Sequence, residues 1–344
     1  MKKKILSILC FITLACLSVF GLTACGEVDN EDKAVFTVEN GVITGLTDYG
    51  KTLTEIVIPE TINGVTITTI GDNAFSYMKN VTSIKMPSTI TKINWYAFCG
   101  CSSLTNIEIP NGVTTIGDFA FSSCDSLDSI IVPPSVTSIG RCAFYDLKEI
   151  TLPNTVTQFR EIGFTDKLEK VNFMGTADEW AQSKWGAEMT YIFLPYAGYD
   201  LYFNGELATD VNLTTGIEPY AFYLCKSITS VRIDGNIERV GYSSFERCSN
   251  LTSVDICEGE PQTISENAFK MCHKLETVKI PTSVKWIERE AFSYFTSPVT
   301  INYEGSYSEW NEITLRNKWN FNSKKIEIIF KSGSSIFVSD NGWL

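Results

Sequence analysis

The stretch TKINWYAFCGCSSLTNIEIP at residues 91–110 is followed by a second stretch of the same kind, TTIGDFAFSSCDSLDSIIVP, at residues 114–133. Both contain an Ala-Phe pair, a cysteine three residues later, and aliphatic residues that end at a proline. Self-similarity at a fixed period indicates a solenoid of stacked turns. The phenylalanine recurs every 23 or 24 residues in two groups: Phe75, Phe98, Phe121 and Phe144, then Phe222, Phe245, Phe269 and Phe292.

Each repeat carries the pattern of one short, half-buried strand. In the first stretch Leu104, Ile107 and Ile109 are the aliphatic residues, and the last of them alternate with polar residues, as in a strand with one buried face. Pro110 follows at once, and proline cannot donate to a continuing ladder. One repeat cannot bury these residues alone, so we expect parallel strands stacked about 4.8 Å apart around one continuous core.

The order C-x-x-L-x-x-I-x-I-P, then V-x-x-I-G-x-x-A-F, resembles the BspA-type leucine-rich repeat of bacterial surface lipoproteins. The resemblance covers most of residues 50–303. It implies a β-rich leucine-rich-repeat solenoid, with stacked parallel strands, a repeat of about 23 residues and few short helices. The resemblance also implies a role in adhesion and in attachment to host or microbial macromolecules. Members of this family are typically not enzymes.

Two arrays are expected along the chain. VFTVENGVITGL (35–46) places Asn-Gly between alternating apolar runs, which predicts a hairpin that caps the first repeat. FMGTADEWAQSKW (173–185) and YEGSYSEWNEITLRNKW (303–319) resemble the family's terminating units, in which a short helix covers the open end of the stack. We assign 35–190 to the capping hairpin and the first array with its GTxxEW unit. We assign 191–344 to the second array, its GSxxEW unit and a C-terminal tail.

Residues 1–24 have the pattern of a lipoprotein signal peptide. Three lysines precede the apolar run ILSILCFITLACLSVFGL, and LTAC before Gly26 resembles a lipoprotein cleavage box. By that resemblance Cys25 is the lipidated first residue of the mature chain, and 25–34 is a tether. An uncleaved membrane helix is the alternative. We expect an extracytoplasmic protein at the bacterial cell surface, in contact with the membrane through its lipid anchor only.

The charge of the chain limits its partners. The formal charge is −12, from 28 Lys and Arg against 40 Asp and Glu. Residues 1–24 hold three of the lysines and no acids, so their removal leaves 25 against 40, or −15. This balance argues against nucleic acid as a partner, because its phosphate backbone requires a basic footprint.

The two cysteines on either side of Gly100 suggest a metal or redox site at first sight. However, the place of Cys101 in the repeat is taken by Met78 and Phe295 in other turns, which marks an apolar inward slot. Disulfides between turns and a metal site are the alternatives to free thiols. The expected column of buried thiols comprises Cys101, Cys124, Cys225, Cys248 and Cys272. Three cysteines lie outside the column: Cys99, Cys142 and Cys257. The Cys-Gly-Cys is thus interpreted as one core residue, Cys101, beside one loop residue, Cys99.

No catalytic, cofactor-binding or metal-ligating residue is predicted. The single histidine, His273, is expected at the surface, and the chain contains no CxxC pair, no GxxxxGK[ST] and no strand-linked GxGxxG. The acidic neighbours Asp178 and Glu179, and likewise Glu288 and Glu290, are interpreted as solvated positions. A carboxylate-dependent hydrolase is therefore a less favoured alternative.

Surface residues are the remaining candidates for function. The central outward position of successive strands forms a row of mixed charge, here called the outward row: Val57, Lys85, Glu108, Ile131, Thr151, Asn172, Arg232, Asp255, Lys279 and Asn302. The candidate contacts for a protein partner are Lys85, Glu108, Ile131, Arg232, Asp255 and Lys279. The candidate contacts for a sugar ring, on condition that they are exposed and near one another, are the loop aromatic residues Trp95, Tyr96 and Trp286.

The expected function is protein binding or adhesion by a lipid-anchored rod at the cell surface, without cofactor or enzymatic activity. A glycan-binding module that uses exposed loop aromatic residues is the principal alternative, and a pure structural spacer is a further one. The partner is expected to be an extracellular protein or glycan.

Overall fold

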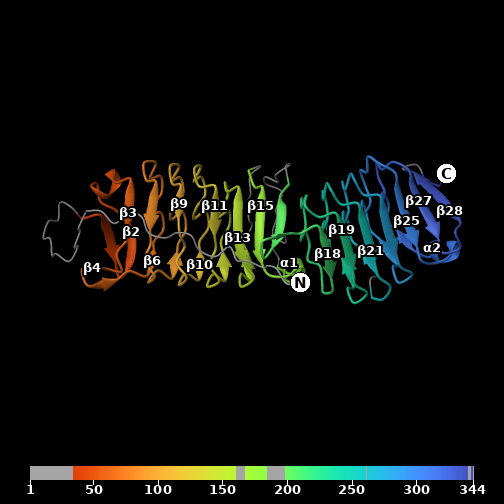
Figure 1. Cartoon of the computed structure of the whole chain (residues 1–344), viewed down its shortest axis with the longest axis horizontal. Coiled ribbons are helices and arrows are strands. Elements are labelled where there is room, and N and C mark those ends of the chain that lie inside the picture. The colour runs from red at the N-terminus through yellow and green to blue at the C-terminus, as the bar shows by residue number, and fades with distance from the viewer. Residues whose placement is uncertain (1–33, 160–166, 184–197, 261, 340–341, 344) are drawn as a thin grey trace, which may run out of the picture.

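The chain forms one elongated rod of stacked turns, with the first array at one end and the C-terminal strands at the other (Figure 1). The computed structural model describes residues 34–159, 167–183, 198–260, 262–339 and 342–343. Strands of successive turns pair in parallel, so the predicted β-rich solenoid is confirmed. The predictions for the signal peptide, Cys25 and the tether, and the array boundary at 190–191, fall outside the described residues.

Three sheets line the first array, one on one long side of the rod and two in succession on the other. A seven-stranded sheet has the order β1 (Phe36–Glu39), β2 (Val42–Leu46), β6 (Thr69–Ile70), β8 (Lys92–Ile93), β10 (Thr115–Ile116), β12 (Ser138–Ile139) and β14 (Gln158–Phe159). The opposite side begins with β3 (Glu55–Val57), β7 (Ser83–Lys85) and β9 (Asn106–Ile107). It continues with a five-stranded sheet of β11 (Ser129–Ile131), β13 (Glu149–Pro153), β15 (Lys170–Met174), β16 (Asp200–Phe203) and β17 (Glu206–Leu207).

The second array repeats this plan. Its longer sheet has the order β18 (Asp210–Leu213), β19 (Ser230–Ile233), β21 (Ser253–Ile256), β23 (Thr277–Ile280), β25 (Val299–Tyr303), β27 (Ile326–Phe330), β28 (Ser335–Ser339) and β29 (Gly342–Trp343). The facing sheet comprises β20 (Arg239–Val240), β22 (Thr263–Ile264), β24 (Trp286–Ile287) and β26 (Thr314–Leu315). The tail thus provides antiparallel edge strands, because β28 pairs with β27 and β29 with β28.

The predicted N-terminal hairpin is present. β1 and β2 are antiparallel, and Glu39 pairs with Val42 across the two-residue turn. Asn40 and Gly41 both have positive φ, 50° and 80°, as a tight turn of this type requires. A second small hairpin follows in the loop before the first complete turn, from β4 (Thr61–Ile62) and β5 (Val65–Thr66). A single 3-10 turn lies at Gly50–Thr52.

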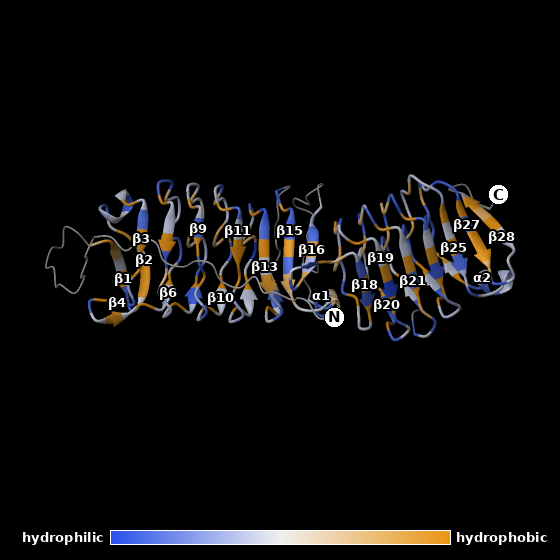
Figure 2. Ribbon diagram, viewed as in Figure 1, coloured by the Kyte–Doolittle hydropathy of each residue, from blue (hydrophilic) through white to orange (hydrophobic). Residues whose placement is uncertain are grey.

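The phenylalanines that define the repeat form the centre of the core. In the first array the rings of Phe75, Phe98, Phe121 and Phe144 stack at centroid distances of 5.2, 5.1 and 5.5 Å. In the second array Phe222, Phe245, Phe269 and Phe292 stack at 5.1, 5.5 and 5.4 Å. Each ring covers its neighbour in the next turn, so the repeat buries its largest side chain only by stacking. Figure 2 shows hydrophobic residues in the strands along the whole rod, with mostly hydrophilic outer loops.

The corner of the turn that carries the Ala-Phe pair has its own backbone ladder. The N–H groups of Asn73, Phe75 and Tyr77 donate to Trp95, Ala97 and Cys99 of the next turn at 2.9, 2.8 and 2.7 Å. In most turns the residues two before and two after the phenylalanine lie in the left-handed region, for example Asn73 (φ 57°) and Tyr77 (φ 59°). The side chains at these positions differ in burial: Tyr77 is exposed, whereas Leu224 and Ser243 are buried.

Two short helices explain the GTxxEW and GSxxEW motifs. In α1 (Ala177–Ala181), Thr176 Oγ1 accepts from the N–H of Glu179 at 3.2 Å, and a Glu179 carboxylate oxygen accepts from the N–H of Thr176 at 2.7 Å. Ser306 and Glu309 make the same capping box for α2 (Tyr307–Trp310). The bond from the Thr176 backbone is the main reason that the pKa of Glu179 is lowered.

Helix α1 joins the two arrays, which differs from the expectation of a unit that covers an open end. The N–H of Glu218 donates to Ala181 at 2.8 Å, and Asp178 accepts from Thr214 and Thr215, so the second array is bonded directly to α1. The stack also continues after α2, through β26 and β27. None of the helices in the described ranges has the length and apolar character of a membrane span.

Candidate functional site

The outward row lies along the paired strands as expected. Val57 pairs with Lys85, and Ile131 with Thr151, which in turn pairs with Asn172. In the second array Arg232, Asp255, Lys279 and Asn302 are consecutive partners. Two apolar side chains of the row are fully in solvent, because Val57 is 67% exposed and Ile131 is 71% exposed. In the second array the row is one line of paired strand positions, whereas in the first array Glu108 follows β9 without pairing and the sheet is interrupted between β9 and β11.

Ion pairs connect the charged residues of the row in the second array. The guanidinium of Arg232 contacts one Asp255 oxygen, and Lys279 Nζ lies 3.6 Å from the other. Lys279 also pairs with Glu304 at 2.9 Å, and the hydrogen bond that its ammonium donates to that carboxylate is the main cause that raises the pKa of Lys279. Alternating signs neutralise this part of the face, so it presents no single-charge groove to a polyanion.

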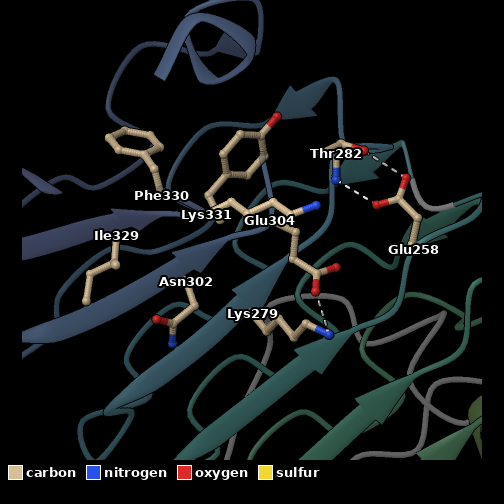
Figure 3. A pocket seen from close by; sticks show the side chains of 9 residues that line it. Glu258, Lys279, Thr282, Asn302, Glu304, Ile329, Phe330 and Lys331 are labelled. Carbon is tan, nitrogen blue, oxygen red and sulfur yellow. Dashed lines mark hydrogen bonds and ion pairs between the residues drawn. The ribbon is translucent and has the colours of Figure 1, made fainter. Parts of the chain in front are cut away.

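A hollow opens where the row reaches its C-terminal end (Figure 3). Its volume is about 790 Å³. One side is apolar, from Ile329 and Phe330, and Glu258 on the other side accepts from the N–H and hydroxyl of Thr282 at 2.8 and 2.9 Å. Besides these residues and Tyr303, the lining comprises Lys279, Asn302, Glu304 and Lys331. Glu304 and Lys331 were not predicted as site residues. Each directly follows the last residue of a strand, β25 or β27, and the alternation of apolar and polar residues does not single out such positions.

A second hollow, of about 510 Å³, lies beside the row in the first array. Lys85 and Glu108 both line it, together with main chain of β7 and β9. Predicted contacts thus border a depression at two places along the rod. No pair of the row shares a buried polar cluster of the kind that binds a small cofactor.

The three predicted loop aromatic residues are exposed but are not brought together. Trp95 is 56% exposed, and Tyr96 and Trp286 are each 38% exposed. Trp95 and Tyr96 follow β8 in the first array, whereas Trp286 lies in β24 of the second. The structure does not bring the three together as one sugar site, because many turns of the rod lie between β8 and β24 (Figure 1).

The column of cysteines consists of buried free thiols. Four of the five donate to a backbone carbonyl, and Cys225 Sγ lies 3.3 Å from Ser227 Oγ. Cys101 Sγ donates to the carbonyl of Phe75 at 3.1 Å, and Cys124 does the same to Phe98 at 3.2 Å. Cys248 and Cys272 repeat the contact in the second array. Burial raises the pKa of Cys101 to about 12 and that of Cys225 to about 11. The thiols are therefore inert at neutral pH.

Cys99 lies in the turn after β8, outside the cysteine column, as predicted. It is nevertheless buried, since Cys99 is 7% exposed and Cys142 is 9% exposed. Gly100 has φ +75°, and a Cβ there would lie 2.6 Å from Cδ1 of Tyr77. The glycine between the two cysteines therefore makes room for the Tyr77 ring. Among the described residues, no three His, Cys, Asp or Glu side chains gather as a metal site.

The predicted solvated acids include two with structural partners. Asp178 accepts four hydrogen bonds from Thr214 and Thr215, which lower its pKa against the opposing effect of burial. Glu290 is 7% exposed and pairs with Lys270 at 2.6 Å. The interpretation as a solvated position was therefore wrong for Glu290, whereas Asp178 is half-buried and hydrogen-bonded. His273 is exposed, as predicted.

Comparison with known proteins agrees with this architecture. The family model described as "BspA type Leucine rich repeat region" matches six copies, over residues 68–183 and 215–341. Among solved structures, a leucine rich cell surface protein from Faecalibacterium prausnitzii is 24% identical, with 83% of this chain and 97% of that chain covered and a TM-score of 0.40. A leucine-rich repeat protein from Bacteroides ovatus is 24% identical, with 88% and 100% covered and a TM-score of 0.35.

The pneumococcal vaccine antigen PcpA is 17% identical, with 86% of this chain and 98% of that chain covered and a TM-score of 0.40. No curated protein matches the chain. The family model covers well over half of the sequence, and its matched residues include all eight stacked phenylalanines. The protein is therefore a member of the BspA type leucine-rich repeat family.

Proposed function

We propose that the protein is a lipid-anchored recognition protein of the bacterial cell surface, which binds an extracellular protein through its outward row. The observation that carries the proposal is the row itself: in each array it places neighbouring side chains from successive strands on one face of a stiff rod. A partner is then bound by many turns at once, as is typical of solenoids.

The composition of the row favours a protein over a polyanion. Ile131 and Val57 offer exposed apolar contacts, and the ion pairs around Asp255 leave little net charge. Interfaces between proteins combine apolar anchors with complementary charges in this way. The C-terminal hollow adds a concave place for a protruding side chain, with Lys331 and Glu304 on its rim.

The family supports a binding role without catalysis, because its repeats typically form interaction surfaces. The lipid anchor rests on the sequence around Cys25. Metabolic labelling with a fatty acid tests it: we expect label in the wild-type protein and none in Cys25→Ser, with the variant released from the membrane fraction. Equal labelling of both proteins would contradict the anchor.

The binding proposal is tested with the chain from Gly26 onward, which contains every described residue. The protein is immobilised and exposed to host mucosal extract and to surface proteins of neighbouring bacteria, and captured proteins are then purified for titration. We expect a saturable partner whose affinity falls at least tenfold for Ile131→Asp and for the double variant Arg232→Glu/Lys279→Glu.

The matched control is Arg239→Glu, because Arg239 is an exposed arginine on β20 of the facing sheet. Its affinity is expected to equal that of the wild type. A partner that is lost with Arg239→Glu and retained by the row variants would place the binding face elsewhere and contradict the proposal.

A further inference from the structure

Exposed aromatic side chains gather at one corner of the first array. Tyr77 is 70% exposed and Trp95 is 56% exposed, and they come from neighbouring turns. The corresponding corner of the second array is different, because Tyr220 packs edge-on against Tyr223 and Tyr242, and Tyr223 is buried. The large apolar surface at the first corner is thus a feature of these particular turns rather than of the fold.

Glycines of the next turn hold two of these rings in place. Gly100 lies under the Tyr77 ring, with three ring atoms within 3.3 Å of the position that a Cβ would occupy. Gly117 lies under Trp95, since a Cβ there would be 2.8 Å from Cδ1 of the indole. Each ring is therefore seated against backbone on one side, while the other side faces solvent.

Tyr96 and Phe119 extend the surface across a third turn. Their rings stack at 5.0 Å with an angle of 7°, and the guanidinium of Arg141 lies over Phe119 at 6.0 Å. The backbone of Arg141 is fixed by its bond to Asp118 Oδ1 at 2.9 Å. We call Tyr77, Trp95, Tyr96 and Phe119 the aromatic platform.

The backbone at three of these residues is left-handed, because Tyr77, Tyr96 and Phe119 have φ of 59°, 54° and 56°. The same conformation recurs at the corner of other turns, for example at Tyr220 and Tyr294, so it belongs to the repeat. The exposed rings of these particular turns are therefore a choice of side chain and not of backbone.

From the seated rings and their polar surroundings we propose that the aromatic platform binds a neutral glycan, with the exposed faces of Trp95 and Tyr77 stacked on the apolar C–H faces of sugar rings. Asp72, Asn73 and Arg141 are exposed beside the platform and supply the carboxylate, amide and guanidinium groups that bind hydroxyls. The rings stay fixed on binding, so little side-chain entropy is lost.

Two observations favour a neutral glycan over other occupants. Asp72 and Asp118 lie at the same place in neighbouring turns as Trp95, and together with the acidic chain they repel uronic or sulfated sugars. The platform also presents flat ring faces beside planar hydroxyl-binding groups. A protein interface, in contrast, centres on apolar anchors that insert into pockets.

The test measures retention of the chain from Gly26 onward on immobilised neutral polysaccharides (a β-glucan, a mannan and a galactan), with hyaluronan and heparin alongside. We expect retention on a neutral polysaccharide, reduced at least tenfold in affinity by Trp95→Ala and by Tyr77→Ala. Trp95→Phe keeps a ring and is expected to retain part of the affinity. Trp286→Ala is the matched control, because Trp286 is an exposed aromatic residue of the second array.

Melting curves establish that each variant is folded, which the exposure of the altered side chains favours. Retention that responds to Trp95→Ala but not to Trp286→Ala supports the platform. The proposal is overturned by retention on hyaluronan or heparin alone, by equal affinity of wild type and the Trp95→Ala and Tyr77→Ala variants, or by absence of retention on every neutral polysaccharide.

Discussion

The indole Nε1 of Trp180 donates a 2.7 Å hydrogen bond to the carbonyl of Ala221, 41 residues later in the chain. This bond ties α1 to the first corner of the second array. Trp310 occupies the equivalent place in α2, and its ring packs on Tyr303 as that of Trp180 packs on Phe173. Its buried indole N–H has no hydrogen-bond partner among the described residues. Of the two tryptophans of this motif, only Trp180 thus makes an indole hydrogen bond to the following array.

Trp180→Phe is therefore expected to destabilise the protein more than Trp310→Phe. Both changes shorten a fully buried side chain, but only the first leaves the Ala221 carbonyl without its donor, which adds about 1–3 kcal/mol. Denaturant unfolding followed by circular dichroism measures the difference, and Trp310→Phe is the built-in control. Equal losses would show that the Trp180 bond contributes nothing to the joint between the arrays.

The thiol column predicts a loss of stability in alkali. Burial raises the pKa of Cys101 from 9.0 to about 12, so the folded thiol stays protonated where the unfolded one ionises. The stabilisation is complete below pH 9 and is lost as pH rises towards about 12, at roughly 1.4 kcal/mol per pH unit for each thiol.

Unfolding titrations between pH 8 and about 11 are expected to show a smaller slope for Cys101→Ala/Cys124→Ala than for the wild type. An unchanged slope would mean that these thiols ionise equally in both states. Alkylation at pH 8 provides a second readout: half-buried Cys257 is expected to react first, and the column only on unfolding.

Gly100 predicts a coupling with Tyr77. Gly100→Ala is expected to destabilise by about 2–4 kcal/mol, because it adds a left-handed alanine and displaces the Tyr77 ring. The double variant Tyr77→Ala/Gly100→Ala retains only the backbone part, so a double-mutant cycle should give about 1–2 kcal/mol of coupling. Strictly additive losses would contradict the contact between ring and glycine.

Two ion pairs of similar geometry are expected to differ in strength. Glu290 and Lys270 are 9% and 19% exposed in their side chains, whereas Arg232 and Asp255 are 54% and 37% exposed. Burial acts to raise the pKa of Glu290, but the bond and charge of Lys270 outweigh it and hold the pKa below its ordinary value. Removing one partner of a buried pair leaves a charge unpaired, whereas an exposed pair is screened.

Glu290→Gln is therefore expected to lose about 2–4 kcal/mol and Asp255→Asn less than about 1 kcal/mol, measured by urea unfolding at pH 7. The Glu290 contribution is present above the ordinary pKa of 4.5 and should be lost as pH falls through the lowered pKa of the folded carboxylate. A larger effect at Asp255 than at Glu290 would reverse this order of importance.

The repeat period, the stacked phenylalanines, the inward cysteine slot and the N-terminal hairpin were all determined by the sequence. The reason is that a solenoid turn buries its apolar residues only against its own copies, so one local pattern repeated at 23 residues admits a single arrangement. The Asn40–Gly41 turn is likewise determined locally, because asparagine and glycine readily adopt the positive φ that this tight turn requires.

Contacts between turns decided the rest. Cys99 is buried and Tyr77 is exposed because the backbone hydrogen bonds of the corner ladder fix the directions of their side chains. The pattern of apolar residues in the sequence does not predict that ladder. The sequence does contain one signal of these contacts, namely the glycines Gly100 and Gly117. Their meaning is clear only once the turns are stacked, because they lie under the rings of Tyr77 and Trp95 of the preceding turn. Whether Trp180 or Trp310 finds an acceptor depends on which turn lies beyond its helix, and stacking alone determines that neighbour.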